Sequence, residues 1–125
     1  MARIVFDTGP LIGLERRDAH AEGWLQAAIQ DGVVPMVPAA ALAEAWRGGP
    51  RSANLARALR SCRVRVTDES VARTAGELLA VMGGAATIGA IVVATAALDG
   101  ADVLTADVDD LAPLGEWADV LVLEL

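Results

Sequence analysis

The sequence predicts an α/β protein in which helices cover both faces of a mostly parallel central sheet, giving three α/β/α layers. Short apolar segments alternate along the chain with longer helical segments, a pattern typical of parallel sheets joined by crossover helices. The 125 residues are 54% hydrophobic, which suffices to fill one core but hardly two. We therefore expect a single domain over residues 1–125.

The expected strands are short segments that are either apolar throughout or alternate in polarity. The first of them ends at Asp7, and the third alternates charged with apolar residues. Pro35 in the second argues for an edge position or an irregular start, because proline cannot donate to the ladder. The five strands are expected at residues 3–6, 33–37, 63–66, 103–105 and 120–123.

The expected helices lie between these strands and begin at residues that favour helix starts. Pro38 stands where one helix can begin, and Ser52 and Thr87 can cap two others. Asp68 or Ser70 can cap the helix that runs to about Met82. The other bounds are 10–15, 19–30, 39–47 and 88–98, and the helix after Ser52 has Leu55, Ala56 and Leu59 on one face.

Composition excludes several classes of function. The net charge is −7 and the pI about 4.5, which disfavours binding nucleic acid through a broad basic surface. All ten basic residues are arginine, so a P-loop, a Schiff-base enzyme and a receiver-type phosphorylation domain are excluded for want of a lysine. One histidine and one cysteine exclude a disulfide framework and a Cys/His zinc site.

The chain is expected in the cytoplasm, without a membrane span. No long apolar segment follows the first residues, and the single cysteine suits a reducing compartment. The uncharged run over residues 78–98 is long enough for a span. Because Gly83 and Gly84 interrupt this run, we interpret it as a helix end, a turn and a buried helix.

Acidic residues at strand ends are the clearest chemical signal. Asp7 follows the first strand and Asp107 the fourth, and the carboxyl ends of parallel strands share one sheet edge. Glu44 is the only acid in an apolar helix, and Asp109 and Asp110 follow Asp107. Converging carboxylates favour Mg²⁺ or Mn²⁺, which prefer oxygen ligands, and point to metal-assisted phosphodiester hydrolysis.

Each acid also has a purely structural interpretation. An Asp after a strand commonly caps a turn or helix, and Asp109 fits a cap or a solvated charge best. Glu44 requires solvent or a partner, since an unpaired buried acid is costly. A haloacid-dehalogenase-like enzyme fits poorly, because Gly9 stands where its second Asp is needed and no lysine is present.

Three segments together resemble the PIN-domain ribonucleases, especially the toxins of VapBC toxin–antitoxin pairs. They are VFDTGPLI (residues 5–12), ALAEAW (41–46) and IVVATAALDGADVLTADVDDL (91–111). The resemblance implies a PIN-like fold and a Mg²⁺- or Mn²⁺-dependent endoribonuclease, usually a homodimer, silenced by a cognate antitoxin. It places the catalytic acids at Asp7, Glu44 and Asp107, and metal ligands at Asp7, Asp107 and Asp110. Thr8 and Thr105 match hydroxyl residues found beside those acids and are candidates for substrate contact.

One position departs from the family pattern. The family has an Asp directly before the Ala-Ile-Val-Val-Ala-Thr-Ala segment, where this chain has Gly89. The chain is then a weakened or inactive member, carries an introduced substitution, or holds its ion with Asp107 and Asp110 instead. We expect low or absent activity compared with a Gly89→Asp variant. The alternative function is an inactive PIN-fold module that binds antitoxin or RNA without cleavage.

Six arginines lie between residues 47 and 65 and offer a local surface for RNA phosphates, although a solvated helix face explains them equally. Arg47 is expected one turn beyond Glu44 on the same helix, which makes it the best candidate for phosphate contact. Trp24, Trp46 and Trp117 are expected as core or interface anchors.

Overall fold

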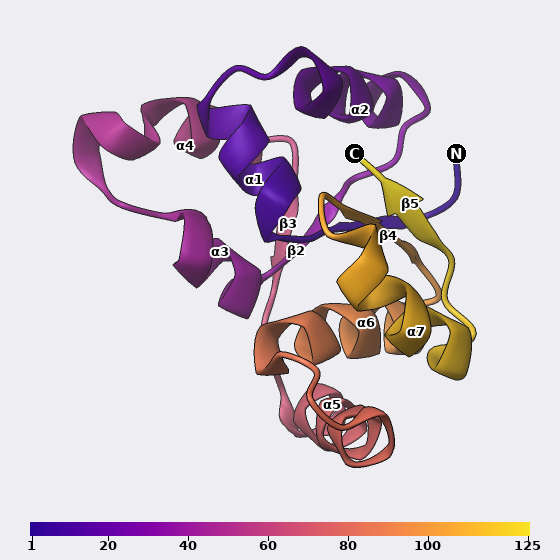
Figure 1. The fold of residues 1–125 in the computed structure, drawn as a ribbon. Coiled ribbons are helices and arrows are strands. Elements are labelled where there is room, and N and C mark those ends of the chain that lie inside the picture. Colours follow the sequence, from indigo (N-terminus) through magenta and orange to yellow (C-terminus); the bar gives the residue numbers. More distant parts are fainter.

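Five parallel strands form one central sheet in the computed structural model, which describes residues 1–125 (Figure 1). The strand order is β3-β2-β1-β4-β5, and all four neighbouring pairs are parallel. The predicted parallel α/β architecture is therefore confirmed. The strands are β1 (Ile4–Phe6), β2 (Met36–Pro38), β3 (Arg63–Arg65), β4 (Asp102–Thr105) and β5 (Val122–Glu124).

Helices cover the sheet on both sides. In Figure 1, α1, α2 and α4 lie above the sheet, and α5, α6 and α7 lie below it. The chain connects β1 to β2 and β3 in one direction and returns to β4 and β5 in the other. Right-handed crossovers in opposite directions place their helices on opposite faces. The helices are α1 (Thr8–Glu15), α2 (Ala19–Gln30), α3 (Ala39–Ala45), the 3₁₀ helix η1 (Gly49–Ser52), α4 (Ala53–Leu59), α5 (Glu69–Met82), α6 (Thr87–Asp99) and α7 (Val108–Ala118).

One hydrophobic cluster of 24 buried residues fills the space between the layers. The central strand β1 is buried at all three positions, as expected for a strand covered on both faces. The helix α6 contributes six buried residues and contacts β1, β2 and β4. Trp24 packs against this core, whereas Trp117 is 63% exposed and is not a core anchor.

The strand order reverses between β1 and β4, which are neighbours in the sheet but far apart in the sequence. Ligand sites in open α/β sheets form at such a reversal, outside the carboxyl ends of the strands. Asp7 directly follows β1, and Asp107 lies two residues beyond β4. The topology thus brings the two predicted acids to the same edge of the sheet.

Several expected element boundaries were wrong. The helix α3 ends at Ala45, because Trp46 adopts an extended conformation (ψ 132°), so Arg47 is not on the helix of Glu44. The helix α7 was not among those expected; Leu111 and Leu114 are buried along it, and Asp109 and Asp110 favour its N-terminal turn.

Pro35 and the expected caps also differ from their predicted places. Pro35 precedes β2, which is an interior strand, so its irregular start is confirmed and its edge position is wrong. Asp68 caps α5 as predicted, by accepting the amide hydrogen of Val71. The side chains of Ser52 and Thr87 cap no helix; the residue before α6 is Ala86.

No single helix has both the length and the apolar composition needed to cross a membrane, and the α5–α6 pair passes that test only jointly, across a bend of 120°. The bend falls at the two glycines Gly83 and Gly84, both with positive φ. The uncharged run is thus divided between two helices, as predicted.

Candidate active site

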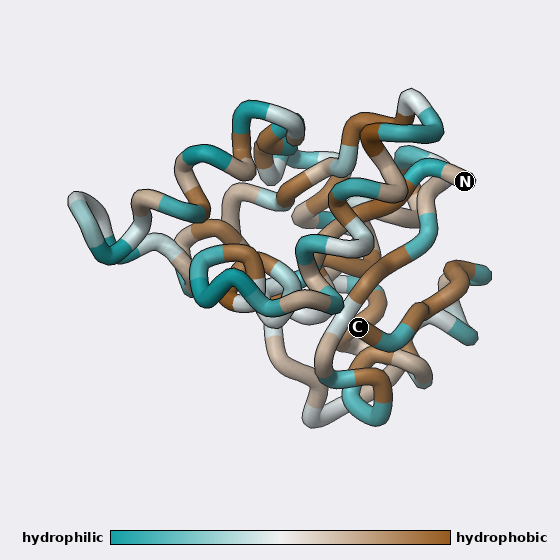
Figure 2. The backbone as a smooth tube through the Cα atoms, turned by 90° about the horizontal axis from the view of Figure 1, so that it is seen from above, coloured by the Kyte–Doolittle hydropathy of each residue, from teal (hydrophilic) through white to brown (hydrophobic).

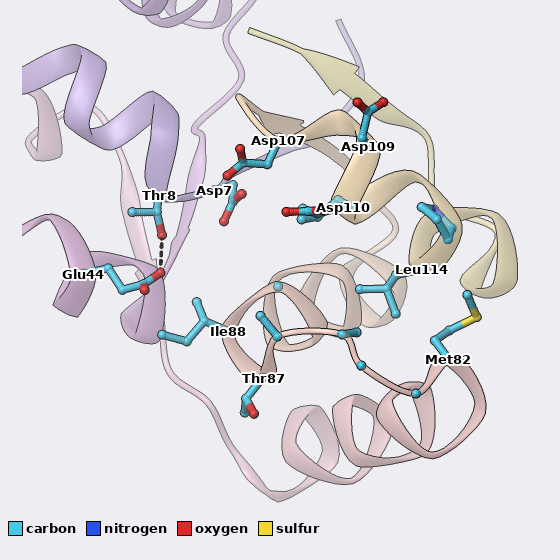
Figure 3. Close-up of a pocket in the computed structure, with 17 residues that line it drawn as sticks. Asp7, Thr8, Glu44, Met82, Thr87, Ile88, Asp107, Asp109, Asp110 and Leu114 are labelled. Atoms are coloured by element: carbon cyan, nitrogen blue, oxygen red, sulfur yellow. Dashed lines mark hydrogen bonds between the residues drawn. The ribbon is translucent and has the colours of Figure 1, made fainter.

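Five carboxylates line one open cavity of about 690 Å³ at the carboxyl edge of the sheet (Figure 3). Asp7 and Asp107 come from the strand ends, and Glu44 comes from α3 on the other side. In Figure 3 the carboxylates of Asp7, Asp107 and Asp110 point toward a common centre, whereas Asp109 points away. The structure therefore brings together all four acids that the sequence predicts for the site.

Asp7 is the most deeply buried of these acids, with 6% of its surface exposed. Burial raises the pKa of its carboxyl above 3.8, and the nearby charges of Asp107 and Glu44 raise it further. Hydrogen bonds from the Thr105 hydroxyl and the Thr8 backbone oppose this rise. Because burial and neighbouring negative charges disfavour the ionised form of Asp7, a nearby cation would stabilise its carboxylate.

The Thr105 hydroxyl connects the two strand-end acids. It donates a hydrogen bond to Asp7 Oδ2 (2.8 Å) and accepts one from the backbone N–H of Asp107 (2.9 Å). Thr105 is fully buried, so its hydroxyl does not reach the cavity surface. This geometry favours positioning of Asp7 and Asp107 over contact with a substrate.

Glu44 lines the opposite wall and is exposed to solvent. Its charge is therefore hydrated, which removes the free-energy cost of burying an acid on an apolar helix. Its Oε1 accepts a hydrogen bond from the Thr8 hydroxyl at 2.8 Å, shown dashed in Figure 3. Thr8 is the first residue of α1 and follows Asp7 directly. The bond therefore fixes the Glu44 carboxylate beside Thr8 and leaves its other oxygen, Oε2, free.

Asp107, Asp109 and Asp110 reach the cavity from the beginning of α7. Asp107 precedes this helix, and its backbone carbonyl accepts the amide hydrogens of Asp110 and Leu111. Asp110 stands in the first turn, where the helix dipole stabilises an anion. Sequence reasoning missed the helix itself, and with it the apolar part of the wall formed by Leu111 and Leu114.

Gly89 lines the same cavity, in the first turn of α6. A Cβ atom built there meets only Leu111 Cδ1, at 3.4 Å, so the backbone leaves room for a side chain. That first turn contains no acidic residue, and no side chain caps the helix. An Asp at position 89 would thus fit into the cavity wall beside a favourable helix dipole.

The chemical type of the side chains that line the cavity suits a hard divalent cation. Every charged group lining the cavity is a carboxylate, and Mg²⁺ commonly binds one or two carboxylates while it keeps several waters. No three of these acids lie close enough to hold an ion jointly in the structure. The geometry offers Asp7 as one ligand and either Asp107 or Asp110 as a second. Gly89 supplies no further carboxylate to the cavity wall.

Arg47 lies outside this constellation. Its guanidinium donates a hydrogen bond to the Trp46 carbonyl at 2.7 Å, and it is not among the residues that line the cavity. The end of α3 at Ala45 turns the chain away before Arg47 is reached. Its contact with a phosphate stays a prediction.

Several solved structures have the same fold. One is VapBC2 from Rickettsia felis bound to a promoter DNA fragment, with a TM-score of 0.79, 11% identity and 98% of each chain covered. DNA-bound VapBC from Salmonella typhimurium has a TM-score of 0.75 at 15% identity, covering 99% of this chain and 98% of that one. FitAcB from Neisseria gonorrhoeae has a TM-score of 0.66 at 24% identity, with 95% of each chain covered.

The family assignment rests on the sequence itself. No curated protein matches this chain significantly. The sequence model of the PIN domain, however, matches residues 4–113, which include every acid of the cavity. The chain therefore belongs to the PIN domain family.

Proposed function

We propose that this protein is a VapC-like toxin that hydrolyses RNA phosphodiester bonds with Mg²⁺ or Mn²⁺ in the carboxylate-lined cavity. The observation that carries the proposal is that Asp7, Asp107 and Asp110 line one cavity with Glu44 on its other side (Figure 3). A bound divalent ion supplies charge neutralisation and Lewis acidity at the phosphate. PIN domain toxins are generally nucleases, which supports this class of chemistry.

In this proposal the acids and threonines of the cavity have different roles. Asp7 and Asp107 hold the ion, with Asp110 beside them, and Thr105 fixes the first two relative to each other. Thr8 donates to Glu44 Oε1 and so holds this carboxylate at the cavity wall. Glu44 would then be the carboxylate that accepts a proton from an attacking water.

A second candidate function is a PIN-fold module that binds its antitoxin or RNA without cutting. Gly89 favours it, because the cavity wall lacks a carboxylate where the backbone leaves room for one. The two functions share the fold and differ only in turnover.

The partners are proposed from the solved structures with this fold. One of these is described as a toxin–antitoxin complex from Klebsiella pneumoniae, and two others are described as VapBC bound to DNA. We expect a cognate antitoxin to cover the cavity and the chain to form a homodimer in the cytoplasm. Size-exclusion chromatography with light scattering, with and without a co-expressed antitoxin, tests both associations.

A cleavage assay decides between the two functions. A labelled RNA is incubated with the protein as it stands, with Gly89→Asp and with Gly89→Asn, each with Mg²⁺, Mn²⁺ or EDTA. We expect metal-dependent cleavage that Gly89→Asp raises at least tenfold, while the uncharged Gly89→Asn variant does not. Asp7→Asn in the Gly89→Asp background should abolish it. If no variant cleaves RNA with either metal, the hydrolase proposal is wrong.

A further inference from the structure

The arginines of this chain are segregated from its acids. Residues 45–67 contain six arginines and no Asp or Glu, whereas the rest of the chain holds four arginines and all seventeen acidic residues. A net charge of −7 therefore hides one strongly cationic segment. Most of it forms a projection that we call the arginine arm, residues 46–60, which comprises the loop after α3, then η1 and α4.

The arginine arm begins at the acidic cavity and leads away from it. Glu44 lines the cavity, and Trp46, two residues later, starts the arm. In Figure 1 the chain runs from α3 out to the left edge of the molecule and returns through α4 to α1. The same leftmost projection is coloured as hydrophilic in Figure 2.

Four arginines of the arm are exposed and lack an acidic partner. The two others of the cationic segment differ, because Arg65 pairs with Asp68 and Asp99, and Arg63 lies on β3. No ion pair is formed by any arginine of the arm, although Arg57 donates a hydrogen bond to Asn54. The four are Arg47, Arg51, Arg57 and Arg60.

The arm is braced by two partly buried contacts, so the backbone that carries its arginines is held in place before any ligand arrives. Ser52 is fully buried, and its hydroxyl accepts the backbone N–H groups of Arg47 (2.8 Å) and Gly48 (3.0 Å). The Glu15 carboxylate accepts the backbone N–H of Leu55 (2.6 Å), which fixes α4 to the end of α1. A preorganised cationic surface loses less entropy on binding than a mobile one.

We propose that the arginine arm binds the phosphates of single-stranded RNA that flank the phosphate held in the acidic cavity. The inference rests on the proposed function and adds where the rest of the substrate lies. An acidic cavity repels a polyanion, so a neighbouring cationic surface is needed to hold the chain there. Arginine suits this task, because its planar guanidinium binds phosphate oxygens in pairs.

The distance from cavity to arm matches a substrate of several nucleotides. Thr8 lies at the cavity and Glu15 at the other end of α1, a helix of eight residues. At 1.5 Å per residue this helix is about 12 Å long. Since Glu15 anchors the start of α4, Arg57 and Arg60 lie beyond the reach of the phosphate in the cavity. They meet neighbouring phosphates of the same strand.

The test measures binding apart from cleavage, by fluorescence anisotropy of a labelled 20-nucleotide single-stranded RNA in EDTA. The arm variant is Arg57→Gln/Arg60→Gln. The control is Arg3→Gln/Arg73→Gln, which removes the same charge outside the arm, from two exposed arginines. Affinity is recorded between 50 and 300 mM salt, and circular dichroism checks that both variants fold.

The arm variant should bind RNA roughly 25-fold more weakly at 0.1 M salt and reduce the slope of log K against log salt by about 1.4, or 0.7 per lost phosphate contact. The control should leave the slope unchanged. Equal losses in both variants, or none in either, would overturn the inference. So would tighter binding of a polyglutamate peptide than of RNA, which would assign the arm to an acidic protein partner. Failure of Gly89→Asp to cleave RNA, with the arm effect intact, would refute the hydrolase alone.

Discussion

The hydroxyl of Thr105 offers the sharpest test of how the site is built. Replacing Thr105 with valine keeps the shape and removes two hydrogen bonds, one to the Asp7 carboxylate and one from the Asp107 backbone N–H. A hydrogen bond to an ionised group contributes about 1.5–3 kcal/mol, and a neutral one about 0.5–1.5 kcal/mol. Thr105→Val should therefore lower the free energy of unfolding by about 2–4 kcal/mol at neutral pH.

The cost of Thr105→Val should depend on pH. The Thr105 hydrogen bond lowers the pKa of Asp7, so its removal raises that pKa further above 3.8. Between the two folded-state pKa values the variant holds a proton that the wild type has lost, and its relative stability falls as pH rises. The destabilisation should thus be smallest at acidic pH, where Asp7 is protonated in both proteins, and largest above the pKa of the variant.

The matched control is Thr95→Val. Thr95 is also buried (1% exposed), but its hydroxyl only donates to the Ile91 carbonyl within α6. Such a bond back to the helix contributes less than about 1 kcal/mol. Urea unfolding of both variants from pH 4 to 8, followed by circular dichroism, gives the comparison. The reasoning is refuted if Thr105→Val costs no more than Thr95→Val, or if its cost is the same at every pH.

Three further variants test the cavity and the arm. Asp7→Asn should raise the melting temperature at pH 7, because the raised pKa of Asp7 makes folding less favourable as pH rises through it; an unchanged or lower value would count against burial as the cause. Gly89→Asp should gain about 2.7 kcal/mol in the free energy of unfolding, and a higher melting temperature, in 10 mM Mg²⁺ relative to EDTA if the ion is at 100 times its Kd, whereas Gly89→Asn should not; equal gains would contradict a ligand at this position. Ser52→Ala should cost about 1–3 kcal/mol in urea unfolding, because it leaves two backbone donors without their acceptor; a neutral result would show that the arm is not braced there.

Local patterns predicted the parts of the site that depend on strand ends. Asp7 and Asp107 could be placed at one edge before any coordinates, because parallel strands end on the same side of a sheet. Asp110 was inferred from its place after Asp107 in the segment that resembles the PIN-domain family. Glu44 was inferred because it is the only acid in an apolar helix. Of these inferences, the placement of Asp7 and Asp107 needed only the alternation of strands and helices.

The missed features depend on backbone conformation and packing that the residue pattern does not show. Ser52 was expected to cap α4, but its hydroxyl accepts backbone donors of Arg47 and Gly48, which a sequence pattern does not reveal. The helix α7 was overlooked because Pro113 interrupts its apolar pattern, although burial of Leu111 and Leu114 against the core stabilises it. Tertiary packing overrode the local signal in α7, whereas the Ser52 contacts follow from the local path of the backbone after α3.

The sequence by itself determined the parallel α/β fold and the edge of the sheet where the acids gather, because both follow from periodicity and strand direction. Only the tertiary structure decided how those acids are held. It buried Asp7, placed the Thr105 hydroxyl between Asp7 and Asp107, and left room beside Gly89. Desolvation and hydrogen-bond geometry depend on neighbours from several elements, and those neighbours are set only when the layers pack together.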